Sequence, residues 1–146
     1  MLNRRIEDVM SRIPVVHLSP AATVREAAEN MAMKHISSIA VSQDENEALI
    51  GIFTERDLIT RVVAEGKDPQ STKLADVMTK DPVTVTIDQT VLQAIGAMRD
   101  NDLRHLPVIK DGKLISMVSV RDFVGNEIAE LDHERELAMD YWEHIR

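Results

Sequence analysis

The sequence predicts an α+β fold in which two copies of a β-α-β-β-α unit pack as a pseudo-two-fold pair. The chain has 146 residues, of which 44% are hydrophobic and 29% charged. This composition is typical of one globular domain with a proper core. The second half of the sequence repeats the first half. Each half also shows the hydrophobic spacings of strands and helices in the same order.

The internal repeat relates residues 6–58 to residues 74–123. The two segments align over about 50 positions when the first copy carries three extra residues. Fifteen aligned positions are identical. Examples are Asp8/Asp76, Pro14/Pro82, Thr23/Thr90, Arg56/Arg121 and Asp57/Asp122. A unit of about 50–60 residues leaves one face of its sheet uncovered, and we expect the other copy to cover that face.

The elements follow the same order in both copies. The expected strands are Val15–Leu18, Ser38–Ser42 and Leu49–Phe53 in the first copy, and Val83–Ile87, His105–Ile109 and Leu114–Ser119 in the second. A helix follows the first strand, and a capping box at Thr23 or Thr90 marks its start. A second helix closes each copy and begins near Arg56 or Arg121.

The repeat sets the expected boundaries: repeat 1 at residues 6–66, a polar linker at 67–73, repeat 2 at 74–130 and a helical tail at 131–146. Apolar residues near and within the tail follow a spacing of three and four, which Arg135 interrupts. These residues are Ile128, Leu131, Ala138, Trp142 and Ile145. Such an amphipathic helix needs a surface, on its own module or on another chain.

Composition excludes several classes of function. The chain has no cysteine, which excludes disulfides, thiolate metal sites and cysteine nucleophiles. A net charge of −8 and 3% aromatic residues argue against a nucleic-acid partner. The apolar runs are too short to cross a membrane. The N-terminal segment lacks the apolar stretch of a secretory signal, so we expect a cytoplasmic protein.

The sequence does not favour an enzyme. Its five glycines form neither a P-loop nor a dinucleotide-binding fingerprint. It contains no nucleophile elbow and no zinc-binding helix motif. Its histidines lack the spacing of metal ligands. We therefore expect no catalytic residues, no metal site and no required cofactor.

Polar residues gather where a strand gives way to a closing helix. Thr54, Arg56 and Asp57 stand at this junction in the first copy, and Ser119, Arg121 and Asp122 stand at it in the second. A helix N-terminus, a hydroxyl and a guanidinium favour phosphate, and a carboxylate can accept hydrogen bonds from ribose hydroxyls. The same T/S-x-x-D spacing is also a helix-capping pattern that needs no ligand. Both interpretations stay open here.

Further polar residues stand at the start of a middle strand. Arg104 is a candidate phosphate ligand and His105 a polar wall, although a solvated arginine and a backbone-bonded histidine would fit equally well. Thr84 in the early strand is another candidate contact. The copies differ at these positions and at Gly51, which is Ser116 in the second copy. We therefore expect two clefts of unequal affinity.

The duplicated motifs resemble those of the CBS-domain pair, also called a Bateman module, and the chain looks like a stand-alone member. The resemblance covers about residues 6–130. Its marks are DVM-x3-P-V at the start of each copy, R-H-L-P-V at 104–108, G-x-x-T-x-R-D at 51–57 and S-x-x-S-x-R-D at 116–122.

The resemblance implies a regulatory module that binds an adenosine-containing ligand in a cleft between the repeats. AMP, ADP or ATP is expected first, and S-adenosylmethionine and NAD(H) also occur in the family. In family members the Thr/Ser and Asp of the T/S-x-x-D element contact phosphate and ribose, and the early and middle strands hold adenine. The candidate ligand contacts are Val16, Ser37, Ser38, Ala40, Thr54, Arg56 and Asp57, and Thr84, Arg104, His105, Pro107, Ser119, Arg121 and Asp122.

Family members often assemble into discs of two modules, so we expect a homodimer with Trp142 near a contact. An effector protein, which the sequence does not identify, would receive the signal. The alternative is a ligand-independent dimerisation or scaffold module in which the T/S-x-x-D elements only cap helices.

Overall fold

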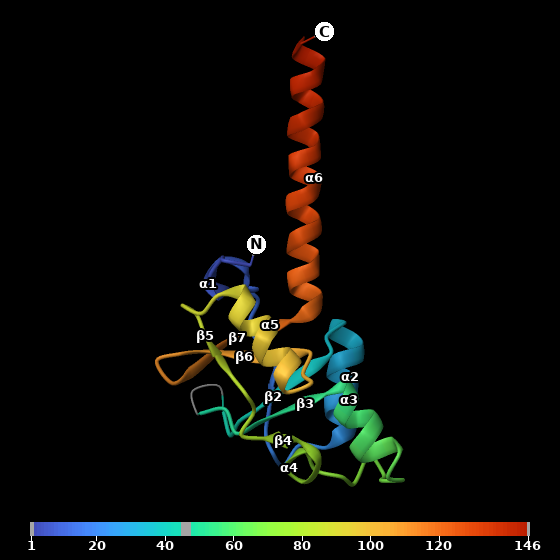
Figure 1. The fold of residues 1–146 in the computed structure, drawn as a ribbon. Helices are drawn as coiled ribbons and strands as arrows, with labels where there is room; N and C mark the ends of the chain where they lie inside the picture. Colours follow the sequence, from blue (N-terminus) through green and yellow to red (C-terminus); the bar gives the residue numbers. More distant parts are fainter. Residues whose placement is uncertain (1, 45–47, 146) are drawn as a thin grey trace.

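The computed structural model describes residues 2–44 and 48–145, and the surroundings of side chains as far as residue 140. Its elements form two small sheets with helices packed on them (Figure 1). The first copy contains α1 (Ile6–Val9), β1 (His17–Leu18), α2 (Val24–Lys34), β2 (Ser38–Val41), β3 (Gly51–Thr54), α3 (Glu55–Asp57) and the π-helical segment η1 (Leu58–Val63). The second contains α4 (Leu74–Val77), β4 (Thr79–Lys80), β5 (Val85–Thr86), α5 (Val91–Asp100), β6 (His105–Lys110), β7 (Lys113–Ser119) and α6 (Val120–Ile145).

The predicted order of strand, helix, strand, strand and helix is confirmed in both copies. In each, an early strand runs parallel to a middle strand, which pairs antiparallel with the next. The early strands are shorter than predicted and keep two residues each. In the first copy the Ala40 backbone N–H of β2 still donates to the carbonyl of Val16 at 3.0 Å, and residues 13–16 also line a cavity. The short helices α1 and α4 and the strand β4 were not predicted.

The two long helices within the repeats begin at the predicted caps. The Thr23 hydroxyl accepts a hydrogen bond from the Glu26 backbone at 3.2 Å. Thr90 and Gln93 form a complete capping box, with bonds of 3.2 and 2.9 Å. The spacing predicts an apolar face of Val24, Ala27, Ala28 and Met31 in the first helix and of Val91, Ala94, Ile95 and Met98 in the second. Three residues of each face are buried, whereas Ala28 is half-buried and Ile95 is 37% exposed.

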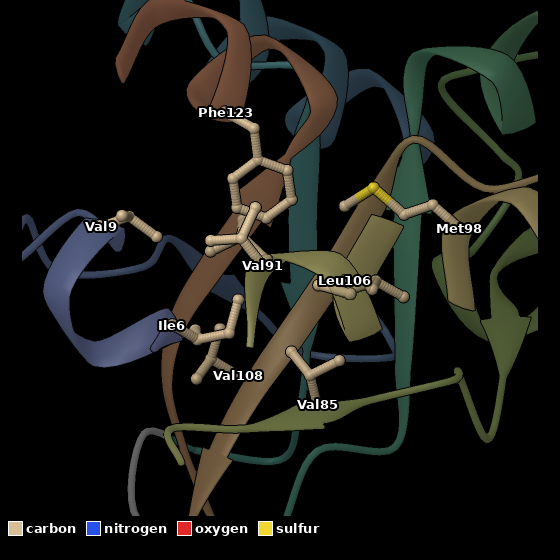
Figure 2. Packing of buried hydrophobic residues seen from close by; sticks show 10 residues of the cluster. Ile6, Val9, Val85, Val91, Met98, Leu106, Val108 and Phe123 are labelled. Atoms are coloured by element: carbon tan, nitrogen blue, oxygen red, sulfur yellow. The ribbon is translucent and has the colours of Figure 1, made fainter. Parts of the chain in front are cut away.

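The short helices exchange places between the copies. Ile6 and Val9 of α1 pack in the core of the second copy, beside Val91, Leu106 and Phe123 (Figure 2). The Ile6 backbone N–H donates to the carbonyl of Gln89 at 2.8 Å.

The first copy shows the matching arrangement. Leu74 and Val77 of α4 pack in its core with Val24 and Phe53. The Leu74 backbone N–H donates to the carbonyl of Ala22 at 2.9 Å. Each core is thus completed by a helix from the other copy, and the two repeats fold as one body.

The closing helix of the second copy and the predicted tail are one helix, α6, with no break at residue 130. It projects far beyond the rest of the molecule (Figure 1). Residues 131–140 are all exposed, so this part of the tail does not fold back on its own module. Among the described residues, no helix is both long and apolar enough to cross a membrane.

Candidate functional site

A cavity of about 950 Å³ lies between the two copies. Strand pairing explains which residues meet there. Ser38 of β2 pairs with Thr54 of β3, and His105 of β6 pairs with Ser119 of β7. Each antiparallel pair therefore brings the start of a middle strand beside the strand–helix junction of the same copy, and the cavity joins the two junctions.

Most of the predicted site residues line this cavity: Val16, Ser37, Ser38, Thr54, Arg56, Asp57, Arg104, His105, Ser119, Arg121 and Asp122. Three others lie outside its lining. Thr84 is exposed elsewhere on the surface, and Ala40 and Pro107 are buried within β2 and β6. Ala40 is flanked by His17 and Ile52 on the neighbouring strands.

The lining also contains residues that the sequence did not single out. They include Ser11, Ile13, Met31, Glu55, Thr79 and Asp102. Ser11 follows α1, and Thr79 follows α4. Because these helices cross to the opposite copy, the linear motifs gave no signal that the residues after them reach the cavity. Glu55 lies inside the G-x-x-T-x-R-D motif, at one of its variable positions.

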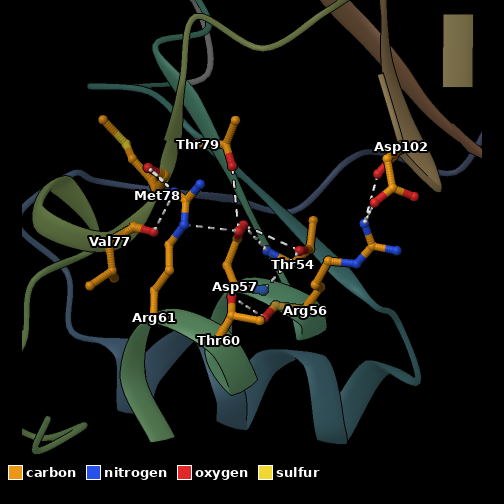
Figure 3. A network of polar contacts seen from close by, with 9 residues as sticks. All are labelled: Thr54, Arg56, Asp57, Thr60, Arg61, Val77, Met78, Thr79 and Asp102. Atoms are coloured by element: carbon orange, nitrogen blue, oxygen red, sulfur yellow. Dashed lines mark hydrogen bonds and ion pairs between the residues drawn. The ribbon is translucent and has the colours of Figure 1, made fainter. Parts of the chain in front are cut away.

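The first strand–helix junction is a closed network of polar contacts (Figure 3). The Thr54 backbone N–H and hydroxyl donate to Oδ2 of Asp57 at 3.0 and 3.2 Å, and the Asp57 N–H donates to the Thr54 hydroxyl at 3.2 Å. The other carboxylate oxygen accepts from Thr79 at 3.4 Å and forms an ion pair with Arg61 at 3.6 Å. Asp57 is only 6% exposed, so both carboxylate oxygens are engaged within the protein.

The second junction is simpler. The Ser119 backbone N–H donates to Oδ2 of Asp122 at 2.9 Å, and the Asp122 N–H donates to the Ser119 hydroxyl at 3.2 Å. The Asp122 side chain is half-buried rather than buried. Both copies thus form the capping arrangement, and the second carboxylate is the more accessible to a ligand.

Three arginines line the cavity in different settings. Arg56 donates from Nη1 to the backbone carbonyl of Asp102 at 2.7 Å and contacts the Asp102 carboxylate at 3.4 Å. This contact joins the first junction to the turn before β6 (Figure 3). Arg104 and Arg121 are exposed at the cavity. Although the protein has a net charge of −8, the arginines that line the cavity can bind an anion there.

His105 connects the two copies across the cavity. Its Nε2 lies 2.6 Å from the Ser37 hydroxyl. Burial lowers the pKa of His105, and the nearby carboxylates of Asp122 and Glu55 oppose this effect. Because its pKa is lowered, the imidazole is neutral at neutral pH, and it offers the cavity a hydrogen-bonding group rather than a positive charge.

The copies differ at the position of Gly51 in β3 and Ser116 in β7. A Cβ atom at Gly51 would lie 2.6 Å from Sδ of Met78 and 2.9 Å from the carbonyl oxygen of Thr79, because β4 pairs with β3 there. Ser116 is buried, and its hydroxyl donates to the carbonyl oxygen of Ser11 at 2.9 Å. In the second copy a hydrogen bond from the Ser116 side chain to Ser11 therefore stands where the first copy packs Gly51 closely against Met78 and Thr79. The two copies are not equivalent at this position.

The described residues contain no group of three or more His, Cys, Asp or Glu side chains that could hold a metal ion. The side chains that line the cavity supply hydroxyls, guanidiniums, carboxylates and the imidazoles of His35 and His105, beside the apolar side chains Ile13, Val15 and Val16.

Comparison with known proteins identifies the family. The CBS domain family matches residues 6–64 and 74–127. The "CBS domain-containing protein CBSX3, mitochondrial" of Arabidopsis thaliana is 40% identical over 118 residues, which are 79% of this chain and 56% of that protein. The chain thus spans little more than half of this relative.

Two solved structures show the same fold. The CBS domain protein PAE2072 from Pyrobaculum aerophilum, complexed with AMP, is 29% identical, with a TM-score of 0.74 over 82% of this chain and 89% of that one. The hexameric CBS-CP12 protein from bloom-forming cyanobacteria is 28% identical, with a TM-score of 0.75 over 83% and 69%. The family matches two segments in tandem, as the internal repeat predicts, and the solved structures share the fold. The chain therefore belongs to the CBS domain family as a pair of CBS domains.

Proposed function

We propose that this CBS pair is a regulatory module that binds an adenine nucleotide, AMP, ADP or ATP, in the cavity between its repeats. One observation carries the proposal: the cavity brings together two strand–helix junctions, exposed arginines and an apolar wall. This is the set of groups that a phosphate, a ribose and a base each need. The AMP complex of the relative from Pyrobaculum aerophilum supports the same ligand class.

The second junction is the better site for phosphate and ribose. Arg104 and Arg121 are exposed there and would pair with phosphate, and the half-buried Asp122 would accept hydrogen bonds from ribose hydroxyls. Asp57 already uses both of its carboxylate oxygens. Binding at the first junction would therefore have to replace internal contacts, and we expect it to be weaker.

Signalling follows from where the second junction lies. Ser119 and Asp122 form the first turn of α6, so a nucleotide bound beside them acts on the base of the projecting helix. A ligand shifts an equilibrium only as far as it prefers one state. We expect the output to be a changed contact with an effector protein. The module acts by binding rather than by catalysis, in the cytoplasm, and needs no further cofactor.

Thermal unfolding with AMP, ADP, ATP, S-adenosylmethionine and NADH tests ligand binding. A ligand at 100 times its dissociation constant adds about 2.7 kcal/mol, which gives a clear upward shift in Tm. The double variant Arg104→Ala/Arg121→Ala should lose the shift. Arg25→Ala removes an exposed arginine of α2 that pairs with Glu29 and serves as the matched control. The proposal is wrong if none of the five compounds shifts the wild type.

A ligand-independent scaffold is the second candidate, and one observation favours it. Both T/S-x-x-D elements cap their helices through internal hydrogen bonds. On this alternative, replacing Asp122 lowers stability whether or not a nucleotide is present. No AMP-dependent shift in the wild type, together with an equal loss of Tm for Asp122→Ala with and without AMP, would support the scaffold. A wild-type shift that Asp122→Ala loses would support the sensor.

Self-association is the last part of the proposal. We expect a homodimer, and the CBS-CP12 relative from bloom-forming cyanobacteria, which is hexameric, supports self-association. Trp142, which the sequence places near the contact, lies outside the residues whose side chains are described. Light scattering over a range of concentrations tests the dimer, and a monomer throughout would refute it.

A further inference from the structure

In the first copy one arginine ties the closing helix to α4. Arg61 of η1 donates from Nη1 to the carbonyl oxygens of Val77 and Met78 at 3.2 and 2.9 Å. Its Nε forms an ion pair with Oδ1 of Asp57 at 3.6 Å (Figure 3). The two carbonyls lie at the end of α4, where they have no partner within the helix and where an arginine side chain can bind them. One guanidinium thus binds three acceptors from two segments of the chain.

The second copy contains the same three acceptors. They are the carbonyls of Val9 and Met10, which end α1, and the carboxylate of Asp122. The backbone is alike at the two helix ends, since φ and ψ are −69° and 149° at Met10 and −66° and 158° at Met78. Because α1 and α4 each pack in the core of the opposite copy, the end of α1 comes to Asp122 as the end of α4 comes to Asp57.

The donor is not repeated, because the internal repeat aligns Arg61 with Asn126. The Asn126 side chain is shorter and donates to the backbone carbonyl of Asp122 on its own helix at 2.9 Å. Among the described residues, no side chain donates to the carbonyl of Val9 or Met10. In the same part of the chain, the Asp122 carboxylate accepts at Oδ2, which leaves Oδ1 for another donor.

A groove of about 480 Å³ lies at these acceptors, beside the base of α6. Asn126 lines the groove at the position that Arg61 has in the first copy. Small residues keep the groove open, since Ser11, Gly125 and Ala129 are in its lining and are exposed. The acceptors that hold a guanidinium in the first copy are therefore accessible from solvent in the second.

We propose that this groove binds an arginine side chain of a partner protein. A guanidinium has five N–H donors in one plane, which suit two carbonyls and a carboxylate better than the single centre of an ammonium group. Arg61 shows that this set of acceptors holds a guanidinium in this fold. Charge favours a basic partner, because the adjoining exposed residues 131–140 of α6 include four acidic side chains and one arginine.

Arg121 also lines the groove, and its positive charge opposes a second guanidinium there. The equivalent Arg56 reaches across the cavity to the carbonyl of Asp102 and not to the end of a short helix. Arg121 is exposed, and among the described residues it forms no hydrogen bond with the end of α1. The acceptors therefore stay open to a donor from outside the chain.

NMR titration of the protein with acetyl-arginine N-methylamide tests the site, because this probe presents arginine as a peptide chain does. Acetyl-citrulline N-methylamide has the same shape without the charge and is the control. For the arginine probe alone, we expect saturable shifts of the amide resonances of residues 9–11 and 122–126, with a dissociation constant on the order of 1–10 mM. The proposal is overturned if no shift saturates or if the citrulline compound acts equally.

Asn126→Arg provides the guanidinium from the chain itself. It should weaken binding of the probe at least about tenfold and raise Tm by about 2–4 °C, through the contacts that Arg61 makes in the first copy. Gln70→Arg adds the same charge at an exposed position outside the groove and should do neither. Arg121→Gln removes a like charge and should tighten binding. An Asn126→Arg protein that binds the probe as Gln70→Arg does, or an Arg121→Gln protein that binds it more weakly, contradicts the proposal.

Free L-arginine decides the source of the guanidinium. A partner's side chain is supported if the peptide-like probe binds at least as tightly as free arginine. Free arginine that binds at least about tenfold more tightly would overturn the partner protein and show an amino-acid ligand instead. All titrations are made without nucleotide, so their outcome is independent of the proposed nucleotide site.

Discussion

Asp57 and Asp122 occupy the same place in the repeated motif but have different surroundings. Asp57 is buried and bound by Thr54, Thr79 and Arg61. Asp122 is half-buried and bound within its own junction by Ser119. A buried carboxylate with several donors contributes to holding the fold, whereas a more open one can serve a ligand.

The first prediction compares the two aspartates. Asp57→Ala should lower the free energy of unfolding by about 2–4 kcal/mol, because it removes a cap and leaves buried donors without an acceptor. Asp122→Ala removes a cap at a more open site and should cost about 1 kcal/mol. Urea unfolding measures both. Equal losses would contradict the difference in burial.

The second prediction concerns the pH dependence of stability. Burial lowers the pKa of His105 in the folded protein, so the unfolded chain binds a proton more readily. Stability should therefore fall as the pH drops below about 6.5, the pKa of an unperturbed histidine. His105→Gln keeps a polar partner for Ser37 and should flatten this decline in urea unfolding between about pH 7 and 5. The exposed His133→Gln is the control. Identical slopes for both variants would contradict the prediction.

At the scale of the elements, the order of strands and helices could be predicted because each long element repeats its hydrophobic spacing and its cap. The start of α2 at Thr23 and of α5 at Thr90 needed only local information. The four-residue helices α1 and α4 are too short to show a helical period. Their crossing to the opposite copy depends on packing that no local pattern encodes.

The same reason limits the prediction of the candidate site. The T/S-x-x-D elements were visible, but their dual role as caps and candidate ligand sites was left open by the sequence. Thr79 reaches Asp57 because β4 pairs with β3, and Ser11 reaches Ser116 because α1 crosses over. The position of a residue in a predicted strand does not show whether its side chain faces the cavity. Three predicted contacts therefore lie outside the cavity lining: Thr84, Ala40 and Pro107.

The third prediction concerns the position of Gly51 in β3 and of Ser116 in β7. Gly51→Ser should lower the free energy of unfolding by about 1–3 kcal/mol, since a side chain there collides with Met78 and the backbone of Thr79. Ser116→Gly loses one hydrogen bond to Ser11 and should cost about 1 kcal/mol. Hydrogen exchange measured on both variants should rise at β4 for Gly51→Ser and remain unchanged there for Ser116→Gly. A silent Gly51→Ser would contradict the close approach of β4.

At the scale of the whole molecule, the crossed helices make the pair a single cooperative body. The core of each copy contains apolar residues of a short helix from the other copy: α1 packs in the second copy and α4 in the first. Neither repeat can unfold without exposing apolar residues in the core of the other. The cavity therefore lies between two repeats that are packed together. The proposed ligand at the second junction would then act on the base of α6.

The fourth prediction tests this cooperativity. Ile6 is fully buried in the core of the second copy, whereas Ile13, seven residues later, is 77% exposed. Ile6→Ala should lower the free energy of unfolding by about 2–5 kcal/mol, and Ile13→Ala should change it by less than about 0.5 kcal/mol. Because α1 closes the opposite copy, the Ile6→Ala protein should still unfold in one transition, with the calorimetric and van't Hoff enthalpies of unfolding in agreement. Two separated transitions would show that the repeats unfold independently despite the exchange of α1 and α4.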